Sequence, residues 1–153
     1  NNKRKKSNYR SVLAFNSKID TVDDIKLFDL ECEKWEKIES SYNTIIQNYR
    51  TISCNNQQDL WKKNKLETSI CMLASDNYDN IYLLFCPSQI SVSKLNQYII
   101  KLDFNIKKTM YLEGGSQASI SIKSEDFIFE KSGAIFDDFL PPIPNAIGFK
   151  RKR

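Results

Sequence analysis

A carboxylate beside two consecutive glycines is the feature of this sequence best suited to chemistry. Glu113 is followed by Gly114 and Gly115, which are two of only four glycines in 153 residues. Glycine lacks a Cβ, so the chain can bend sharply here and bring its amides close to an anionic ligand. Because the chain has no histidine, acid and base chemistry must fall to carboxylates, tyrosine, lysine or cysteine. Glu113 is therefore the leading catalytic candidate, and an ordinary glycine hairpin turn with a solvated Glu113 is the alternative.

Other polar residues could bind a ligand at this junction. Arg50 is one of two arginines outside the terminal basic runs, the other being Arg10. A guanidinium can grip a phosphate through two parallel hydrogen bonds, although a cation at a helix C-terminus can also simply balance the helix dipole. Ser116 and Ser119 could donate to a phosphate or a sugar. A Ser-His-Asp triad is excluded, since the chain has no histidine.

Ordinary glycoside hydrolysis requires a second carboxylate. The sequence does not identify it, because Asp126, Asp137 and Asp138 are near Glu113 only in number. Trp61 and Tyr111 could stack on a sugar ring, but core packing is the favoured interpretation for both.

Short strands must position most of these residues. Apolar or alternating runs predict strands at 12–15, 25–30, 69–74, 81–86 and 127–129, on both sides of the double glycine, and over a short stretch at 51–54. A turn-rich stretch joins 69–74 to 81–86 and predicts a hairpin, which Pro87 should close because proline cannot extend the ladder.

Two amphipathic helices complete the expected fold. Apolar residues recur at steps of three and four from Trp35 to Tyr49, which predicts a main helix that begins near Cys32 and ends at Arg50. A second helix should begin at Ser91 or Ser93. Its expected inner face consists of Val92, Leu95, Ile99 and Leu102. Strands outnumber helices, so we predict a single α+β domain with a mainly antiparallel sheet packed by two helices.

The charge distribution argues against nucleic acid as a partner. The net charge is +4, but eight of the 23 basic residues lie at 3–6 and 150–153, which leaves 15 basic against 19 acidic residues elsewhere. We expect a basic flexible end at 1–11, a domain at 12–149 and a basic tail at 150–153. No apolar run reaches the roughly 20 residues of a transmembrane segment.

The four cysteines leave two interpretations open. None belongs to a Cys-x-x-Cys pair, and the chain has no histidine, so we expect no metal site. The alternatives are four buried thiols, or one or two disulfides. Cys32 and Cys54, which bracket the expected main helix, are the first pair to test.

Residues 111–120, Tyr-Leu-Glu-Gly-Gly-Ser-Gln-Ala-Ser-Ile, resemble the Asp-Gly-Gly or Glu-Gly-Gly signature of the phosphodiester glycosidase family. The mammalian member of that family removes N-acetylglucosamine to uncover mannose 6-phosphate. Residues 28–32, 47–54 and 143–148 are similar, in order and approximate spacing, to segments of bacterial secreted members. The likeness therefore covers most of the chain from about Val12 onward.

The resemblance implies hydrolysis of a sugar-1-phosphate diester without a cofactor, in a secreted or periplasmic protein that binds a glycan or sugar-phosphate ligand. Arg50 would hold the phosphate, and Glu113 would act as acid, base or structural anchor. The matching site positions are Arg50, Glu113, Gly114, Gly115, Ser119 and Asn145. The alternative is an inactive member that binds surface glycan or a partner protein.

The chain also departs from the family pattern. Residues 86–89, Cys-Pro-Ser-Gln, contain no arginine where members often have one, and Ser116 replaces the usual glycine or proline. We also expect that the domain lacks an N-terminal part that would complete the site. The substrate sugar and the oligomeric state stay open at this level.

Overall fold

The computed structural model describes residues 4–6, 8–57, 61, 65–133, 142–143 and 145–150. Over these residues the fold is α+β and dominated by antiparallel strands, as predicted. One sheet has the order β2-β1-β3, with β1 (Ser11–Ser17), β2 (Ile25–Asp29) and β3 (Tyr42–Asn48). A second has the order β5-β4-β6, with β4 (Thr68–Ser75), β5 (Ile81–Ile90) and β6 (Lys108–Gly114). The third pairs β7 (Ser119–Lys123) with β8 (Ile128–Ser132).

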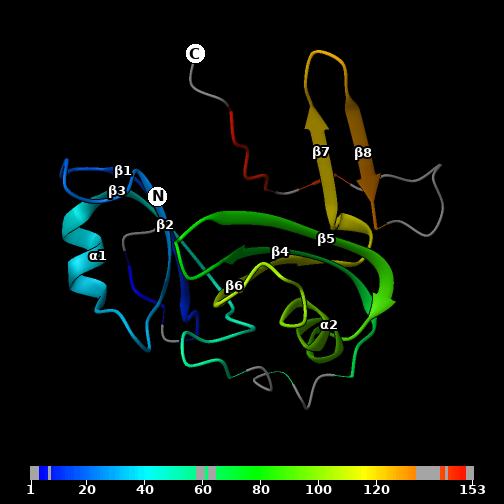
Figure 1. Ribbon diagram of the computed structural model, residues 1–153, viewed down its shortest axis with the longest axis horizontal. Coiled ribbons are helices and arrows are strands. Elements are labelled where there is room, and N and C mark those ends of the chain that lie inside the picture. Colours follow the sequence, from blue (N-terminus) through cyan, green and yellow to red (C-terminus); the bar gives the residue numbers. More distant parts are fainter. Residues whose placement is uncertain are drawn as a thin grey trace.

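Helices cover the two larger sheets on opposite sides (Figure 1). The first helix, α1 (Trp35–Ser41), packs Trp35 and Ile38 against β1 and β2, while α2 (Val92–Ile99) packs against residues of β4. A third apolar cluster lies between the two sheets, because it combines residues of both. Its buried members are Leu13, Leu27, Leu73 and Met110. Alternation of side chains along each strand produces this layering, since neighbours in a strand face opposite sides.

The two larger sheets meet where β3 ends and β6 runs past it. The Tyr111 amide donates to the Tyr49 carbonyl at 2.9 Å, and Arg50 forms an isolated antiparallel bridge with Met110. The segment that follows β3 therefore lies along the free edge of β6 and links the two sheets. Arg50 is thus brought near the strand that ends with Glu113 and Gly114, although 63 positions separate Arg50 from Glu113.

The predicted main helix is wrong beyond Ser41. The chain leaves the helix at Tyr42 in extended conformation and continues as β3, which pairs with β1. Ile45 packs with the cluster under α1, whereas Ile46 packs with the cluster between the sheets. The two side chains point to opposite faces because they are neighbours in a strand. β-branched residues in this run favour the strand once β1 offers it partners. Arg50 thus follows a strand, and the helix-dipole explanation for it fails.

Three smaller expectations also need correction. β5 continues through Pro87 to Ile90, because β5 is an edge strand and its register with β4 shifts near this point. Residues 51–54 form no strand. Leu102 lies beyond the end of α2 and is exposed. The hairpin of β4 and β5 is confirmed, and Ser91 caps α2 by accepting from the Lys94 amide.

Cys32 and Cys54 form a disulfide, while Cys71 and Cys86 are free thiols. Cys86 lies opposite Ile70 in the β4–β5 ladder, so Cys71, the next residue of β4, projects from the other face of the sheet. The register therefore keeps these two thiols apart. None of the helices among the described residues has the length and apolar character needed to cross a membrane.

Candidate functional site

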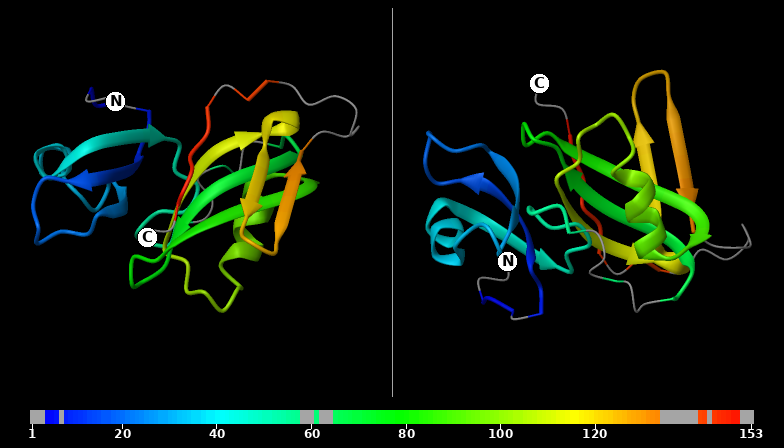
Figure 2. Two further views of the ribbon diagram at one scale, coloured as in Figure 1. Left: turned by 90° about the horizontal axis from the view of Figure 1, so that it is seen from above. Right: turned by 60° about the horizontal axis from the view of Figure 1, so that its bottom comes forward.

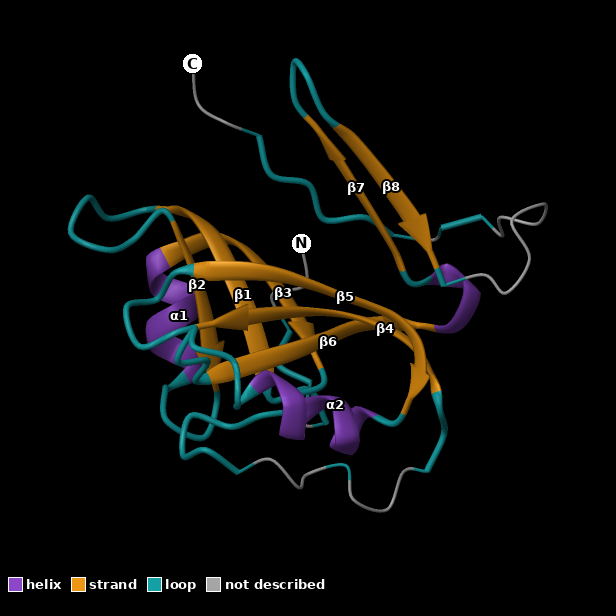
Figure 3. Cartoon of the chain, turned by 45° about the vertical axis from the view of Figure 1, so that its right-hand side comes forward, coloured by secondary structure: helices purple, strands orange, loops and turns teal. Residues whose placement is uncertain are grey.

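The double glycine carries the chain from one sheet to another. β6 pairs with β4 and ends at Gly114, a short 3-10 helix, η1, follows at Gly115–Gln117, and the chain then enters β7, which pairs with β8 (Figure 3). The alternative of an ordinary hairpin turn is wrong, because β6 and β7 belong to different sheets. At this junction the chain passes from the β5-β4-β6 sheet to the β7-β8 sheet.

Close contacts within the chain account for the glycines here. A Cβ on Gly114 would lie 2.2 Å from the Tyr111 hydroxyl, and Gly115 has a φ of +71°. A Cβ on Gly133, just after β8, would lie 1.9 Å from Ser69 Oγ and 2.3 Å from the Gly115 carbonyl oxygen. Ser69 Oγ donates to that carbonyl at 2.7 Å. Three segments therefore meet here at distances that only glycine permits.

Glu113 lies half-buried at the end of β6. Its carboxylate accepts a hydrogen bond from the Gly114 amide at 3.0 Å, so this amide, which we expected to face an anion, is already occupied. Across the ladder Glu113 lies opposite Cys71, whose thiol donates to the Ser119 carbonyl at 3.3 Å. Glu113, Ser119 and the double glycine therefore gather around Cys71.

Burial dominates the titration of the groups around Glu113. It raises the pKa of the Cys71 thiol to about 11, against a hydrogen bond to Ser119 that lowers it, and the Glu113 carboxylate raises it further. Burial also raises the pKa of Tyr111, and Glu113 adds to that effect. Cys71 and Tyr111 are thus both neutral at pH 7, so the carboxylate has no cationic neighbour in this group. Sequence analysis missed Cys71, since only the pairing of β4 with β6 brings it to Glu113.

The side chains of Arg50 and Glu113 leave the backbone on the same face of the second sheet. Arg50 lies opposite Met110 and Met110 opposite Leu73, while Glu113 lies opposite Cys71, two residues from Leu73 in β4. Residues opposite one another in an antiparallel ladder share a face. Met110 and Glu113 are three residues apart along β6 and still share a face, because the register of β6 on β4 shifts between Cys71 and Met72.

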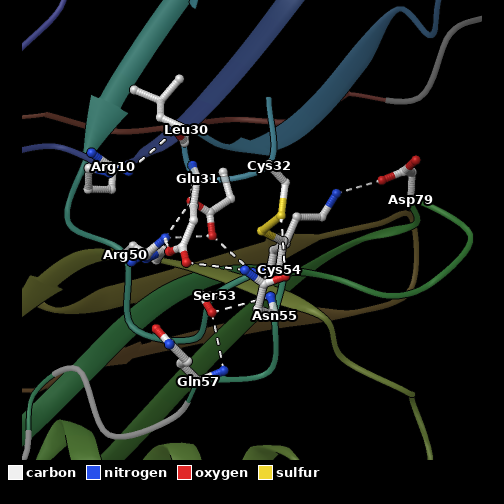
Figure 4. The surroundings of a disulfide bond; sticks show 12 residues. Arg10, Leu30, Glu31, Cys32, Arg50, Ser53, Cys54, Asn55, Gln57 and Asp79 are labelled. Atoms are coloured by element: carbon white, nitrogen blue, oxygen red, sulfur yellow. Dashed lines mark hydrogen bonds and ion pairs between the residues drawn. A yellow bond between two sulfur atoms is a disulfide. The ribbon is translucent and has the colours of Figure 1, made fainter. Parts of the chain in front are cut away.

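The guanidinium of Arg50 nevertheless turns toward β2 and the disulfide (Figure 4). Nη1 donates to both carboxylate oxygens of Asp29, at 2.7 and 2.9 Å, and to Glu31. Its Nε is buried without a hydrogen-bond partner. No ion pair joins Arg50 to Glu113 in the described part of the chain. The structure thus places the two predicted site residues on one face but directs the cation to other carboxylates.

Asp29 anchors this arrangement. Its side chain is 1% exposed and also accepts hydrogen bonds from the amides of Glu31 and Cys54, both at 2.9 Å. Hydrogen bonds from Arg50 and Asn55 hold the pKa of the Glu31 carboxyl below its usual value. Sequence analysis did not assign a role to Asp29 or Glu31, although both lie in the 28–32 segment that resembles the family. Arg10, whose guanidinium donates to the Leu30 carbonyl at 3.4 Å, adds a second cation beside these two carboxylates.

The remaining predicted residues are more dispersed. Ser116 is exposed on η1, and Asn145 is exposed two residues before Ile147, which packs with the cluster between the sheets. Asp126 lies in the turn of the β7–β8 hairpin, at the end remote from Glu113. Asp137 and Asp138 lie outside the described residues.

Trp61 and Tyr111 stack on each other, with ring centroids 5.3 Å apart. The Trp61 indole N–H donates to the Arg50 carbonyl at 2.9 Å. These contacts support the packing interpretation for both rings.

Comparisons of this chain with protein-family models, with curated proteins and with solved structures found no match.

Proposed function

We propose that this chain is a hydrolase of the phosphodiester glycosidase kind, which cleaves a sugar-1-phosphate diester with Glu113 as the group that moves a proton. The observation that carries the proposal is the register of β6. Because of that register, the side chains of Arg50 and Glu113 leave the backbone on the same face of the β5-β4-β6 sheet, with Ser119 and the double glycine beside Glu113. These are five of the positions that the family resemblance selects, and they come from segments far apart in the sequence.

The leaving group makes a single carboxylate sufficient. Water adds to C1 of the sugar, the bond from C1 to the phosphate oxygen breaks, and the phosphate departs as a phosphomonoester. Because that anion is a stable leaving group, it does not need the acid that ordinary glycoside hydrolysis supplies through a second carboxylate. Glu113 then accepts the proton of the attacking water. This chemistry suits Glu113, which forms no ion pair with a cation among the described residues.

The ion pairs of Arg50 favour a second candidate, a family member that binds a glycan without cleaving it. Asp29 and Glu31 already neutralise the guanidinium, so a phosphate must compete with two carboxylates for it. A neutral glycan needs no such cation.

Calorimetric binding and turnover assays on a panel of sugar-1-phosphate methyl diesters test both candidates. The hydrolase should release phosphomonoester, and Glu113→Gln should lower kcat by at least about 100-fold. Arg50→Ala also removes the ion pair with Asp29, so it is assayed under conditions where circular dichroism shows the variant to be folded, and there it should weaken diester binding. Asp103→Asn, a change at an exposed loop carboxylate, is the matched control and should have no effect.

Binding of the panel without turnover would select the second candidate. If the wild-type chain cleaves these diesters and both Glu113→Gln and Arg50→Ala remain fully active, the site assignment is wrong.

A further inference from the structure

The β7–β8 hairpin extends away from the two larger sheets (Figures 1 and 2). Several of its apolar side chains are exposed to solvent. Its register pairs Ile122 with Phe129 and Ile120 with Lys131, so these four side chains share one face. The Phe127 ring stacks on Phe129, with centroids 6.3 Å apart. Phe127 and Phe129 are 53% and 38% exposed, and Ile122 is also exposed. We call this surface the hairpin face.

The opposite side of the hairpin is mostly polar. It carries Ser119, Ser121, Lys123, Glu130 and Ser132, and Ser121 donates to Glu130 at 3.1 Å. The period-two pattern of an amphipathic sheet is thus present, but the face that such a sheet normally buries is in water. A two-stranded hairpin is marginally stable by itself, so a covering surface would stabilise it.

Lysines disfavour pairing along the hairpin edges. Lys123 lies in β7 and Lys131 in β8, and charged residues of this kind discourage the addition of a further strand. The apolar residues are concentrated on one face rather than along an edge. The expected contact is therefore face to face, with two sheets about 10 Å apart.

We infer that the hairpin face packs against the same face of a second copy of this chain. The charges on the hairpin support this occupant. Lys131 lies on the hairpin face near its base, and Glu125 and Asp126 are exposed at its tip. Within the described residues none of the three forms an ion pair.

The same charges select one arrangement of the two copies. A two-fold axis between the faces can place the hairpins tip to tip or tip to base. Tip to tip would bring the carboxylates of both turns together, which is repulsive. Tip to base places each Lys131 beside Glu125 and Asp126 of the other copy, so the antiparallel arrangement is favoured. The pairing is self-complementary, as a two-fold interface requires.

The resulting dimer should be weak. Each copy contributes one face of two five-residue strands, so the interface falls below the roughly 1,200 Å² of stable complexes. A dissociation constant on the order of micromolar is expected. This inference is independent of the proposed hydrolase activity, because Glu113 and Arg50 lie on other elements.

Sedimentation velocity of the full chain over an approximately hundredfold range of concentration tests the inference. Phe129→Ser should weaken dimerisation by at least about tenfold. Ile128→Ser is the matched control, because Ile128 is the neighbouring residue of β8, is 64% exposed and lies on the opposite face, and it should leave the association unchanged. Near-ultraviolet circular dichroism verifies that both variants are folded.

A charge reversal tests the antiparallel arrangement. Lys131→Glu should weaken the dimer, and adding Glu125→Lys and Asp126→Lys to it should restore association. A monomer at every concentration overturns the inference. So does equal weakening by Phe129→Ser and Ile128→Ser, or failure of the triple variant to recover.

Discussion

Removing the carboxylate of Asp29 should cost a large part of the stability of this protein. The Arg50 side chain is 11% exposed and the Asp29 side chain 1%, so both ions are shielded from water. Asp29→Ala would leave the guanidinium without its buried partner and two backbone amides, those of Glu31 and Cys54, without an acceptor. Loss of one partner of a buried ion pair typically costs about 3 to 5 kcal/mol. We expect Asp29→Ala to lower the free energy of unfolding by that amount.

A double-mutant cycle with Arg50→Met isolates the coupling. Each single change should be strongly destabilising, and the double variant should lose at least about 2 kcal/mol less than the sum of the two. Urea unfolding monitored by tryptophan fluorescence, with the disulfide intact, measures all four proteins. Asp103→Ala, at an exposed carboxylate, should stay within about 0.5 kcal/mol of wild type.

The reasoning is refuted if Asp29→Ala costs less than about 1 kcal/mol, or if the two single changes are additive. Either result would mean that Asp29 does not hold the guanidinium, so that a phosphate would have only Glu31 to displace from Arg50. A strong coupling instead means that any phosphate ligand must displace or share this ion pair. The cycle therefore also bears on the choice between hydrolase and glycan binder.

Two further outcomes follow from the junction. Gly133→Ala should destabilise the fold by about 1 to 3 kcal/mol in urea unfolding, because the added Cβ would overlap Ser69 Oγ and the Gly115 carbonyl oxygen. Gly148→Ala is the control and should be neutral, since no atom lies within 4 Å of its added Cβ. Equal effects of the two changes would contradict this packing. Because burial raises the pKa of the Cys71 thiol from 9.0 to about 11, its thiolate fraction at pH 9 is about 50-fold lower than in the unfolded chain. Iodoacetamide at pH 9 should therefore modify native Cys71 about 50-fold more slowly, as measured by mass spectrometry of the Cys71 peptide. Comparable rates would refute the buried thiol.

Local patterns were sufficient for much of the fold. Apolar and alternating runs predicted β1, β2 and the β4–β5 hairpin, and Ser91, one of the two expected caps, lies at the start of α2. These features depend on neighbouring residues, so a short window of sequence contains the necessary information. The α+β class followed from the same windows.

The run after Ser41 shows where local patterns failed. Steps of three and four from Trp35 to Tyr49 suit a helix as well as they suit a helix followed by a strand. β1 decided the outcome, because it offers β3 a ladder of hydrogen bonds that a continued helix would forgo. That partner lies about 30 residues away, outside any local window.

The sequence by itself determined which groups are available for chemistry here, namely a carboxylate before two glycines, scarce arginines and no histidine. Only the tertiary structure decided which of them meet. It placed Arg50 and Glu113 on one face, turned the guanidinium to Asp29 and Glu31, and set Cys71 opposite Glu113. The physical reason is that strand register and burial fix these distances, and both depend on contacts between segments that are remote along the chain.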